Sequence, residues 1–394
     1  MRIEIGPGLV KKVPEILKDF PSNILIVGDK NTLAASEGLN VPGDIHCYDN
    51  CIEANIQQVE ELEKIMANYD GVLAVGSGSI GDICRLASFN AKKEFAVFAT
   101  APSMDGFASS TAPITFGNFK RSVLAHTPSI IIGDTDILSA APKELKAAGF
   151  GDIIAKYVAL IDWQISTMIS DHEPYDLESA ALVKSALEKS MANPDSAQAM
   201  MEALVQSGVA MAMVKHTRPA SGAEHLPAHV WEMKKLEYGE PVAFHGAKVG
   251  VSTLMIARLY HNIASGKYGQ PNFQEDVPDW DRIHKFYGPS FKEDLDSANN
   301  PSILETTSLE ALQNKWPDMV RLIHKELPPY ERLLELMQTA GCITNIEGID
   351  IDRQLALDAL EFHPYMRYRI NLTRLIPMLG LKPDYEEIVD DHCL

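Results

Sequence analysis

Short, continuous runs of apolar residues alternate with longer amphipathic stretches over the first 140 residues. The short runs predict strands at 23–27, 71–75, 95–99 and 129–132, and apolar spacings of three predict helices at 56–69 and 80–91. Strands that are apolar on both sides are typical of a parallel sheet with helices on both faces. Residues 1–140 are therefore expected to form a doubly wound α/β dinucleotide-binding domain.

After about residue 140 the strand signals stop and helical periodicity continues. A helical stretch is predicted at 142–168, with a break at Gly149 and Gly151, and further helices at 177–191, 197–214, 249–264, 330–340 and 353–362. The stretch 266–301, rich in Pro, Asn, Asp and aromatic residues, predicts a long surface excursion. Residues 141–394 are thus expected to form an all-helical domain, which would bind metal and substrate in a cleft beside the first domain.

Charge and cysteine content narrow the classes of partner. The chain carries 35 basic and 54 acidic side chains, a net charge of −19, which repels nucleic acid and anionic membranes. It has no apolar run long enough for a transmembrane helix and no apolar core behind a basic N-terminus, so we expect neither a membrane span nor a signal peptide. Five irregularly spaced cysteines predict free thiols in a reducing cytoplasm: Cys47, Cys51, Cys84, Cys342 and Cys393.

A glycine-rich turn directly follows the predicted strand at 71–75 and opens the next helix. It reads Gly76, Ser77, Gly78, Ser79, Ile80, Gly81, Asp82. The G-x-G-x-x-G spacing allows a pyrophosphate to approach the backbone, and the helix N-terminus supplies N–H groups. In the usual dinucleotide fold the motif follows the first strand, whereas here it follows about the third, and Asp29 ends the first. The motif alone is compatible with a phosphate-binding loop or a structural turn.

A second polar turn follows the predicted strand at 95–99. It contains Thr100, Ala101, Pro102, Ser103, Met104, Asp105 and Gly106. These residues bring hydroxyls and a carboxylate to the carboxyl edge of the sheet, where ligands of α/β proteins bind. Taken by itself, the segment is equally well explained as a polar loop in which Ser103 or Asp105 is a turn residue.

One carboxylate and three imidazoles form the candidate metal set. His225 and His229 are four residues apart and would share a helix face, and His245 precedes another predicted helix. Asp152 is expected at the start of a helix, where it could instead be an N-cap. An Asp/His set suits zinc, nickel or iron(II), and three protein ligands leave a position open for substrate.

Together these motifs resemble the iron-containing alcohol dehydrogenase, glycerol dehydrogenase and dehydroquinate synthase superfamily, and within it the sn-glycerol-1-phosphate dehydrogenases. The resemblance covers nearly the whole chain. It is carried by GSGSIGD at 76–82, TAPSMDGFASS at 100–110, GFGDIIAK at 149–156, RPASGAEHLPAH at 218–229 and FHG at 244–246. The strings TAPSMDG and SGAEH are more specific than the glycine loop. The superfamily also places its glycine loop after a later strand.

The resemblance implies an NAD(P)-dependent enzyme with one divalent metal, zinc first and nickel or iron(II) as alternatives. It implies that Asp152, His225 and His245 bind the metal, and that Asp105, Asp152 and His229 contact the substrate and act in catalysis. It assigns the cofactor to Asp29, Gly76, Ser77, Gly78, Ser79, Ile80, Asp82, Thr100, Ala101, Pro102, Ser103, Ser109 and Lys120. A carboxylate at Asp29 would favour NAD over NADP.

The expected reaction is reduction of dihydroxyacetone phosphate to sn-glycerol 1-phosphate and its reverse, by a homo-oligomer that is a dimer or larger. His229 is a candidate proton relay, or it orients the substrate without moving a proton. Lys156 and helix N-termini are candidates for the substrate phosphate. Three alternatives stay open: a dehydrogenase of glycerol or another unphosphorylated polyol, a cyclase or lyase of the dehydroquinate synthase kind, and a non-enzymatic binding protein.

Overall fold

The computed structural model describes residues 1–49, 53–117 and 119–393. Cys51 and Asn118 lie outside these ranges, and the other four cysteines are free thiols. The chain forms two compact units. The first contains Met1–Ile153 and Ala181–His216, and the second contains Ile154–Ala180 and Thr217–Leu394. No helix of the described residues is both long and apolar enough to cross a membrane.

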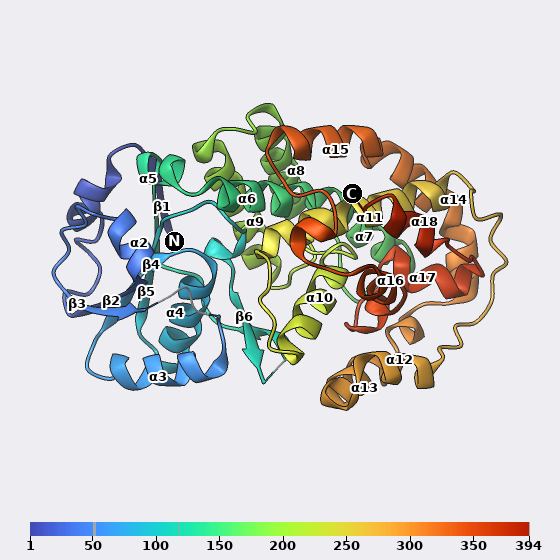
Figure 1. Ribbon diagram of the computed structural model, residues 1–394, viewed down its shortest axis with the longest axis horizontal. Coiled ribbons are helices and arrows are strands. Elements are labelled where there is room, and N and C mark those ends of the chain that lie inside the picture. The colour runs from blue at the N-terminus through green and yellow to red at the C-terminus, as the bar shows by residue number, and fades with distance from the viewer. Residues whose placement is uncertain (50–52, 118, 394) are drawn as a thin grey trace. The chain divides into compact units, whose positions relative to one another are not determined.

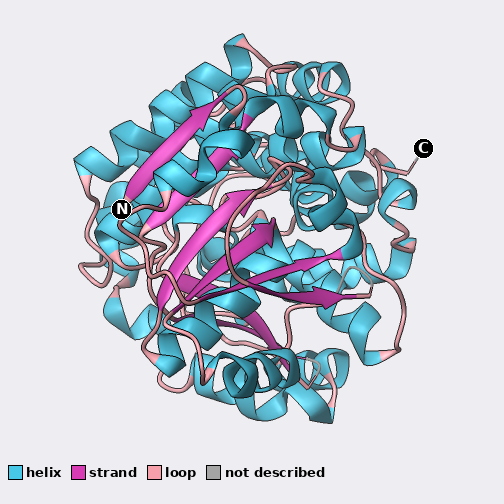
Figure 2. Ribbon diagram, turned by 90° about the vertical axis from the view of Figure 1, so that its left-hand side faces the viewer, coloured by secondary structure: helices cyan, strands magenta, loops and turns pink. Residues whose placement is uncertain are grey.

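The first unit is built on a parallel sheet of six strands in the order β1-β8-β5-β4-β2-β3. Its strands, magenta in Figure 2, are β1 Arg2–Gly6, β2 Ile24–Asp29, β3 Asp44–Tyr48, β4 Gly71–Gly76, β5 Glu94–Ala99 and β8 Ile130–Asp134. A separate antiparallel hairpin pairs β6 Thr111–Phe116 with β7 Phe119–Leu124. The four predicted strands are β2, β4, β5 and β8, while β1, β3 and the hairpin were not predicted.

Helices cover both faces of this sheet, as the apolar runs indicated. On one face, Val72 and Phe95 pack in a core with Leu62 and Ile83. Leu62 and Ile83 belong to α3 and α4, which are labelled in Figure 1. On the other face, the next residues of the same strands, Leu73 and Ala96, pack against the segment 13–20 and α2. The helices of this unit are α1 Val13–Ile16, α2 Lys30–Ala35, α3 Ile56–Met66, α4 Gly78–Ala91, α5 Thr135–Ala140, α6 Lys143–Ile154 and α9 Ala197–Val214. The predicted doubly wound α/β class is confirmed.

The strand order places a topological switch point between β2 and β4. From β2 the chain moves outward to β3, and from β4 it moves the opposite way to β5. Ligands of open α/β sheets bind outside the carboxyl ends of the strands at such a point. Val27 of β2 pairs with Ala74 of β4, so Asp29 and Gly76 end neighbouring strands at the same level.

The second unit is helical in its described residues. It contains α7 Lys156–Ile169, α10 His225–Glu237, α11 His245–Ala264, α12 Trp280–Tyr287, α13 Lys292–Asn299, α14 Leu309–Glu326, α15 Tyr330–Thr339, α16 Arg353–Phe362, α17 Leu372–Leu379 and α18 Tyr385–Asp390. The helix α8, Leu177–Ala192, begins in the second unit and continues in the first.

Three expectations about helices were wrong. The stretch 266–301 is not simply a surface excursion, because α12 and α13 lie within it and bury Ile283 and Leu295. The expected break at Gly149 and Gly151 is absent, because α6 runs through both glycines to Ile154. As a consequence, Asp152 lies in the last turn of α6 rather than at the start of a helix, and it is not an N-cap.

Candidate functional site

The glycine-rich turn joins β4 to α4 at the switch point. Gly76 ends β4, and α4 begins at Gly78 after Ser77, whose side chain makes no capping hydrogen bond. None of the three glycines of the motif has a positive φ. A Cβ on Gly81 would meet nothing within 4 Å, and one on Gly78 would make only ordinary contacts. The protein's own packing therefore gives no reason for these two glycines, whereas a ligand approaching the helix N-terminus would.

Asp82 anchors this loop from inside. It is buried, and its Oδ1 pairs with Arg85 Nη1 at 2.8 Å. Arg85 also donates to the backbone carbonyls of Gly106 and Phe107, which ties α4 to the second polar turn. Burial raises the pKa of Asp82 to about 6, against the opposing effect of Arg85. Arg85 was not predicted from the sequence, because the two backbone carbonyls that it binds, those of Gly106 and Phe107, follow it by 21 and 22 residues.

The other predicted cofactor residues lie along the same edge. Asp29 N-caps α2, where its Oδ1 accepts from the backbone N–H groups of Asn31 and Thr32. Thr100 follows β5, and its N–H donates to the Gly76 carbonyl at 3.3 Å. Four more predicted residues in or shortly after the second turn are buried in this unit: Ala101, Pro102, Ser103 and Ser109. Lys120 lies on β7, opposite Thr115, and is close enough to lower the pKa of Asp82.

Two acidic candidates of the first unit meet each other. The Asp105 N–H donates to Asp152 Oδ2 at 2.9 Å, and Ser207 of α9 donates to Asp105 Oδ2 at 2.8 Å. Two helices, α6 and α9, pack closely against the backbone of the turn that contains Asp105. A Cβ on Gly149 of α6 would lie 1.9 Å from the Pro102 carbonyl oxygen, and one on Gly208 of α9 would lie 2.7 Å from the Asp105 carbonyl oxygen. Ser207 and Gly208 were not predicted, although a Ser-Gly pair within a strong helical pattern is a usable signal.

Three imidazoles cluster in the helical unit. His225 begins α10, His229 is one turn further, and His245 begins α11. The ring centroids lie 5.4 Å apart for His225 and His245, 6.0 Å for His225 and His229, and 5.6 Å for His229 and His245. The predicted helical spacing of His225 and His229 is thus realised, and both rings face the start of α11.

A buried carboxylate orients the first of these rings. Glu224 is completely buried, and its Oε1 lies 2.7 Å from His225 Nδ1 and 2.8 Å from the Gly222 nitrogen. The adjoining Ala223 N–H donates to Asp162, which also accepts from the Tyr260 hydroxyl at 2.6 Å. A carboxylate on Nδ1 favours the tautomer that leaves the Nε2 lone pair available to a metal ion. Glu224 belongs to the SGAEH string, but no role was predicted for it.

A second set of potential ligands lies in the same unit. Each residue of this set offers one potential ligand atom, and the three atoms lie within 4.8 Å of one another: the residues are His229, Glu232 and His245. Glu232, however, forms a 3.0 Å ion pair with the buried Lys248. Burial, together with the charges of His245 and Arg367, lowers the pKa of His229 well below its usual value. A neutral imidazole has one acceptor and one donor nitrogen, which is compatible with both predicted roles of His229, proton relay and substrate orientation.

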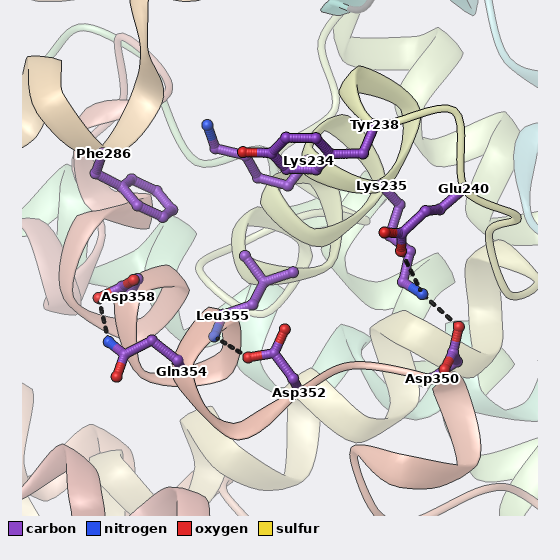
Figure 3. A pocket seen from close by; sticks show the side chains of 10 residues that line it. All are labelled: Lys234, Lys235, Tyr238, Glu240, Phe286, Asp350, Asp352, Gln354, Leu355 and Asp358. Carbon is purple, nitrogen blue, oxygen red and sulfur yellow. Dashed lines mark hydrogen bonds and ion pairs between the residues drawn. The ribbon is translucent and has the colours of Figure 1, made fainter.

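A cavity of about 570 Å³ elsewhere in this unit contains none of these imidazoles. In Figure 3, Lys235 lies between Glu240 and Asp350, and it forms ion pairs with both. Leu355 and Phe286 add apolar surface. Within the described residues, no imidazole lines this cavity, and two carboxylates already compensate the charge of Lys235. We therefore assign the cavity no part in the chemistry.

Comparison with known proteins identifies the family. The profile of the iron-containing alcohol dehydrogenases matches residues 4–142. A glycerol-1-phosphate dehydrogenase [NAD(P)+] from Halalkalibacterium halodurans is 42% identical over 306 residues, which cover 72% of this chain and 76% of that protein. The chain belongs to the glycerol-1-phosphate dehydrogenase family.

More distant relatives agree with this membership. A glycerol-1-phosphate dehydrogenase [NAD(P)+] from Methanococcus maripaludis is 34% identical over 257 residues, which cover 63% of this chain and 73% of that protein. The crystal structure of a probable glycerol dehydrogenase from Sinorhizobium meliloti aligns over 99% of this chain and 94% of its own, with a TM-score of 0.66 at 13% identity. At that identity the match supports the fold alone, an N-terminal α/β part followed by helices.

Proposed function

We propose that this protein is a metal- and NAD(P)-dependent glycerol-1-phosphate dehydrogenase, which reduces dihydroxyacetone phosphate to sn-glycerol 1-phosphate and catalyses the reverse reaction. Family membership supports this activity, since the relatives that match most of the chain carry this name. The single structural observation that carries the proposal is the group of His225 and His245 with Glu224 held on His225 Nδ1.

The residues fit a divalent metal ion. We assign the ion to Asp152, His225 and His245, with Zn²⁺ as the first candidate and Ni²⁺ or Fe²⁺ as alternatives. His225 is already oriented by Glu224, and Asp152 offers a fully buried carboxylate in the last turn of α6, held at Oδ2 by the Asp105 N–H. The set His229, Glu232 and His245 is less suitable, because Lys248 already neutralises Glu232.

The nicotinamide cofactor is assigned to the carboxyl edge of the sheet. Its pyrophosphate would bind at the N-terminus of α4, on Gly76 to Ile80, with Thr100, Ser103, Ser109 and Lys120 nearby. Two observations support this: the uncapped start of α4, and the absence of any close contact that would require glycine at positions 78 and 81. Asp29 is assigned to the adenosine ribose, where its charge would disfavour a 2′-phosphate.

The bound ion would polarise the ketone as a Lewis acid, and the nicotinamide would supply the hydride. The chain's own residues hold the substrate in place. His229, kept neutral by burial, would accept or donate a hydrogen bond at a substrate hydroxyl. Asp105 is fixed by Ser207 and by its N–H bond to Asp152, so its carboxylate could orient the substrate without rearrangement.

A direct test is to measure metal content and then NADH oxidation with dihydroxyacetone phosphate. We expect turnover that stops on chelation and returns with added Zn²⁺ or Ni²⁺. Faster turnover of dihydroxyacetone than of its phosphate would favour a polyol dehydrogenase instead. Substrate conversion without net change in NADH would favour the cyclase or lyase alternative. We further expect a cytoplasmic homo-oligomer, a dimer or larger, which sedimentation of the purified protein would test.

A further inference from the structure

One buried carboxylate of the helical unit accepts hydrogen bonds from three separate segments of the chain. Asp162 lies on α7 and is completely buried, as is Lys156, the candidate for the substrate phosphate at the start of the same helix. Asp162 Oδ2 accepts from the Ala223 N–H at 2.7 Å. Its Oδ1 accepts from the Tyr260 hydroxyl at 2.6 Å and from the Leu372 N–H at 3.0 Å. A buried acceptor with three donors is strongly held, so Asp162 fixes these segments to one another.

Two of the three segments lead to candidate metal ligands. Ala223 comes two residues before His225, which begins α10, and Tyr260 belongs to α11, which begins with His245. The rings of His225 and His245 lie 5.4 Å apart between centroids, and α11 packs against both α10 and α7 (Figure 1). Tyr260 is about four turns from the start of α11. Because this helix runs without interruption over its 20 residues, it holds His245 at a fixed place relative to Asp162.

The turn that precedes α10 lies between two buried carboxylates. The Gly222 N–H donates to Glu224 Oε1 at 2.8 Å, and the next N–H, that of Ala223, donates to Asp162. A Cβ on Gly222 would lie 2.7 Å from both Asp162 Oδ2 and Glu224 Oε2. It would also lie 2.9 Å from the Ala159 Cα. Both carboxylates are buried and hydrogen-bonded, so neither can move aside at low cost, and the turn is fixed between them.

We propose that Asp162 is a positioning residue of the metal centre, which sets how His225 and His245 face each other by joining the turn before α10 to α11. This inference rests on the function proposed above, since that function requires a metal ion at these imidazoles. Glu224 and Asp162 have different tasks. Glu224 selects the tautomer of His225, whereas Asp162 fixes the position of its backbone. The position matters because metal ligands must be held within about 0.5 Å of their productive geometry.

A carboxylate suits this task because both of its oxygens only accept hydrogen bonds. In Asp162→Asn one oxygen is replaced by an NH2 group, which must then face either the Ala223 N–H or the Leu372 N–H. Neither N–H group can accept a hydrogen bond, so one of the joined segments loses its bond while the size of the side chain stays the same. The junction between the turn and α11 is thereby weakened.

The first measurement is competition for Zn²⁺ with a chromophoric chelator. For Asp162→Asn we expect the Zn²⁺ affinity to fall roughly tenfold, the lower end of the 10–100-fold loss typical for residues that contact a metal-bound histidine directly. Tyr260→Phe, which removes one donor and keeps the ring, should show a smaller fall. The matched control is Asp134→Asn in the first unit, because Asp134 is also buried and accepts from three backbone N–H groups. This control should melt at a lower temperature and bind Zn²⁺ like wild type.

A second measurement separates positioning from stability. The visible absorption of protein-bound Co²⁺ reports the geometry around the ion, so Asp162→Asn and Tyr260→Phe should both shift the absorption bands, whereas Asp134→Asn should not. Zn²⁺ should also raise the melting temperature of Asp162→Asn by less than it raises that of wild type. KM for NADH should not change, because the proposed cofactor residues lie in the first unit.

A purely structural role of Asp162 gives a different result. Asp162→Asn would then melt at a lower temperature, but its Co²⁺ bands and Zn²⁺ affinity would equal those of wild type, and this result would overturn the inference. If Asp162→Asn does not fold, an unchanged Co²⁺ spectrum in Tyr260→Phe decides against the inference in the same way. Wild-type protein that binds neither ion would refute the proposed function itself, which keeps the two failures distinct.

Discussion

Replacing Glu224 by Gln tests the metal assignment through a residue that is not itself a proposed ligand. The Glu224 carboxylate is completely buried and is shared by His225 Nδ1 at 2.7 Å and the Gly222 N–H at 2.8 Å. An amide keeps the size of the side chain and one acceptor oxygen, but it removes the negative charge. His225 then loses much of its preference for the tautomer that presents Nε2 to the ion.

The expected loss can be estimated from similar partners of metal-bound histidines. Removing such a carboxylate typically weakens metal binding 10–100-fold, which corresponds to about 1.4–2.7 kcal/mol. Because Glu224 is 0% exposed, solvent screens its charge little, and we expect a loss toward the upper end. Glu224→Ala should cost more, since the buried Gly222 N–H would also lose its acceptor.

The assay is competition for Zn²⁺ with a chromophoric chelator, on variants whose fold has been checked by circular dichroism. Glu240→Gln is the surface control, because its carboxylate side chain is 52% exposed and lies on Lys235, away from the imidazoles. Glu232→Gln is the discriminating variant. If Glu232→Gln loses the ion while Glu224→Gln keeps it, the ligands are His229, Glu232 and His245, and the argument from Glu224 is refuted.

Three further predictions concern the first unit and the stability of the chain. Asp29→Ser keeps an N-cap on α2 but removes a charge worth about 1–4 kcal/mol at 4 Å, so the ratio of NADPH to NADH activity should rise; an unchanged ratio would remove Asp29 from the ribose site. Gly149→Ala should lower the melting temperature, because the clash with Pro102 costs about 1–3 kcal/mol or more of unfolding free energy. Gly81→Ala should instead increase the unfolding free energy by about 0.5–1 kcal/mol. Equal melting temperatures of the two variants would contradict the packing described. Burial lowers the pKa of His363 from 6.5 to about 4, because the folded state disfavours the charged imidazole. The stabilisation of the folded state by neutral His363 is complete above pH 6.5 and is lost as the pH falls toward 4. At about 1.4 kcal/mol per pKa unit, the loss of unfolding free energy amounts to roughly 3 kcal/mol. In His363→Gln, the denaturation midpoint should therefore depend less on pH between pH 6.5 and about 4.

The sheet was predictable where its strands are buried on both faces. Every residue of β2, β4 and β8 is buried, and each of these strands produced a short apolar run. The two edge strands were missed for the converse reason. In β1 and β3, polar residues alternate with apolar ones, and Ile45 of β3 remains 63% exposed. An edge strand has one neighbour and less cover, so its composition is close to that of a loop.

The observed strand order explains the apparent misfit of the glycine loop. Counted with β1 and β3 in place, Asp29 ends the second strand and Gly76 ends the fourth. If β1 is left out of the count, β2 is the first strand, β3 the second and β4 the third. In the sheet, β3 lies on one side of β2 and β4 lies on its other side. This is the doubly wound pattern whose ligand site lies between the first and third strands, here β2 and β4. The position of the motif is therefore correct for this strand order, and only the comparison with the other common order made it unusual.

The residues that orient the candidate site were less predictable than those that carry its chemistry. Histidine spacing was enough to place His225 and His229 on one face of a helix, because a helix periodicity is local. The effect of Arg367 on His229, and of Gly208 on the turn at Asp105, depends on segments about a hundred residues or more apart in the chain. No periodicity encodes such contacts. Substitutions at these supporting positions are therefore the sharper test of the site, because the sequence motif alone would not predict that they matter.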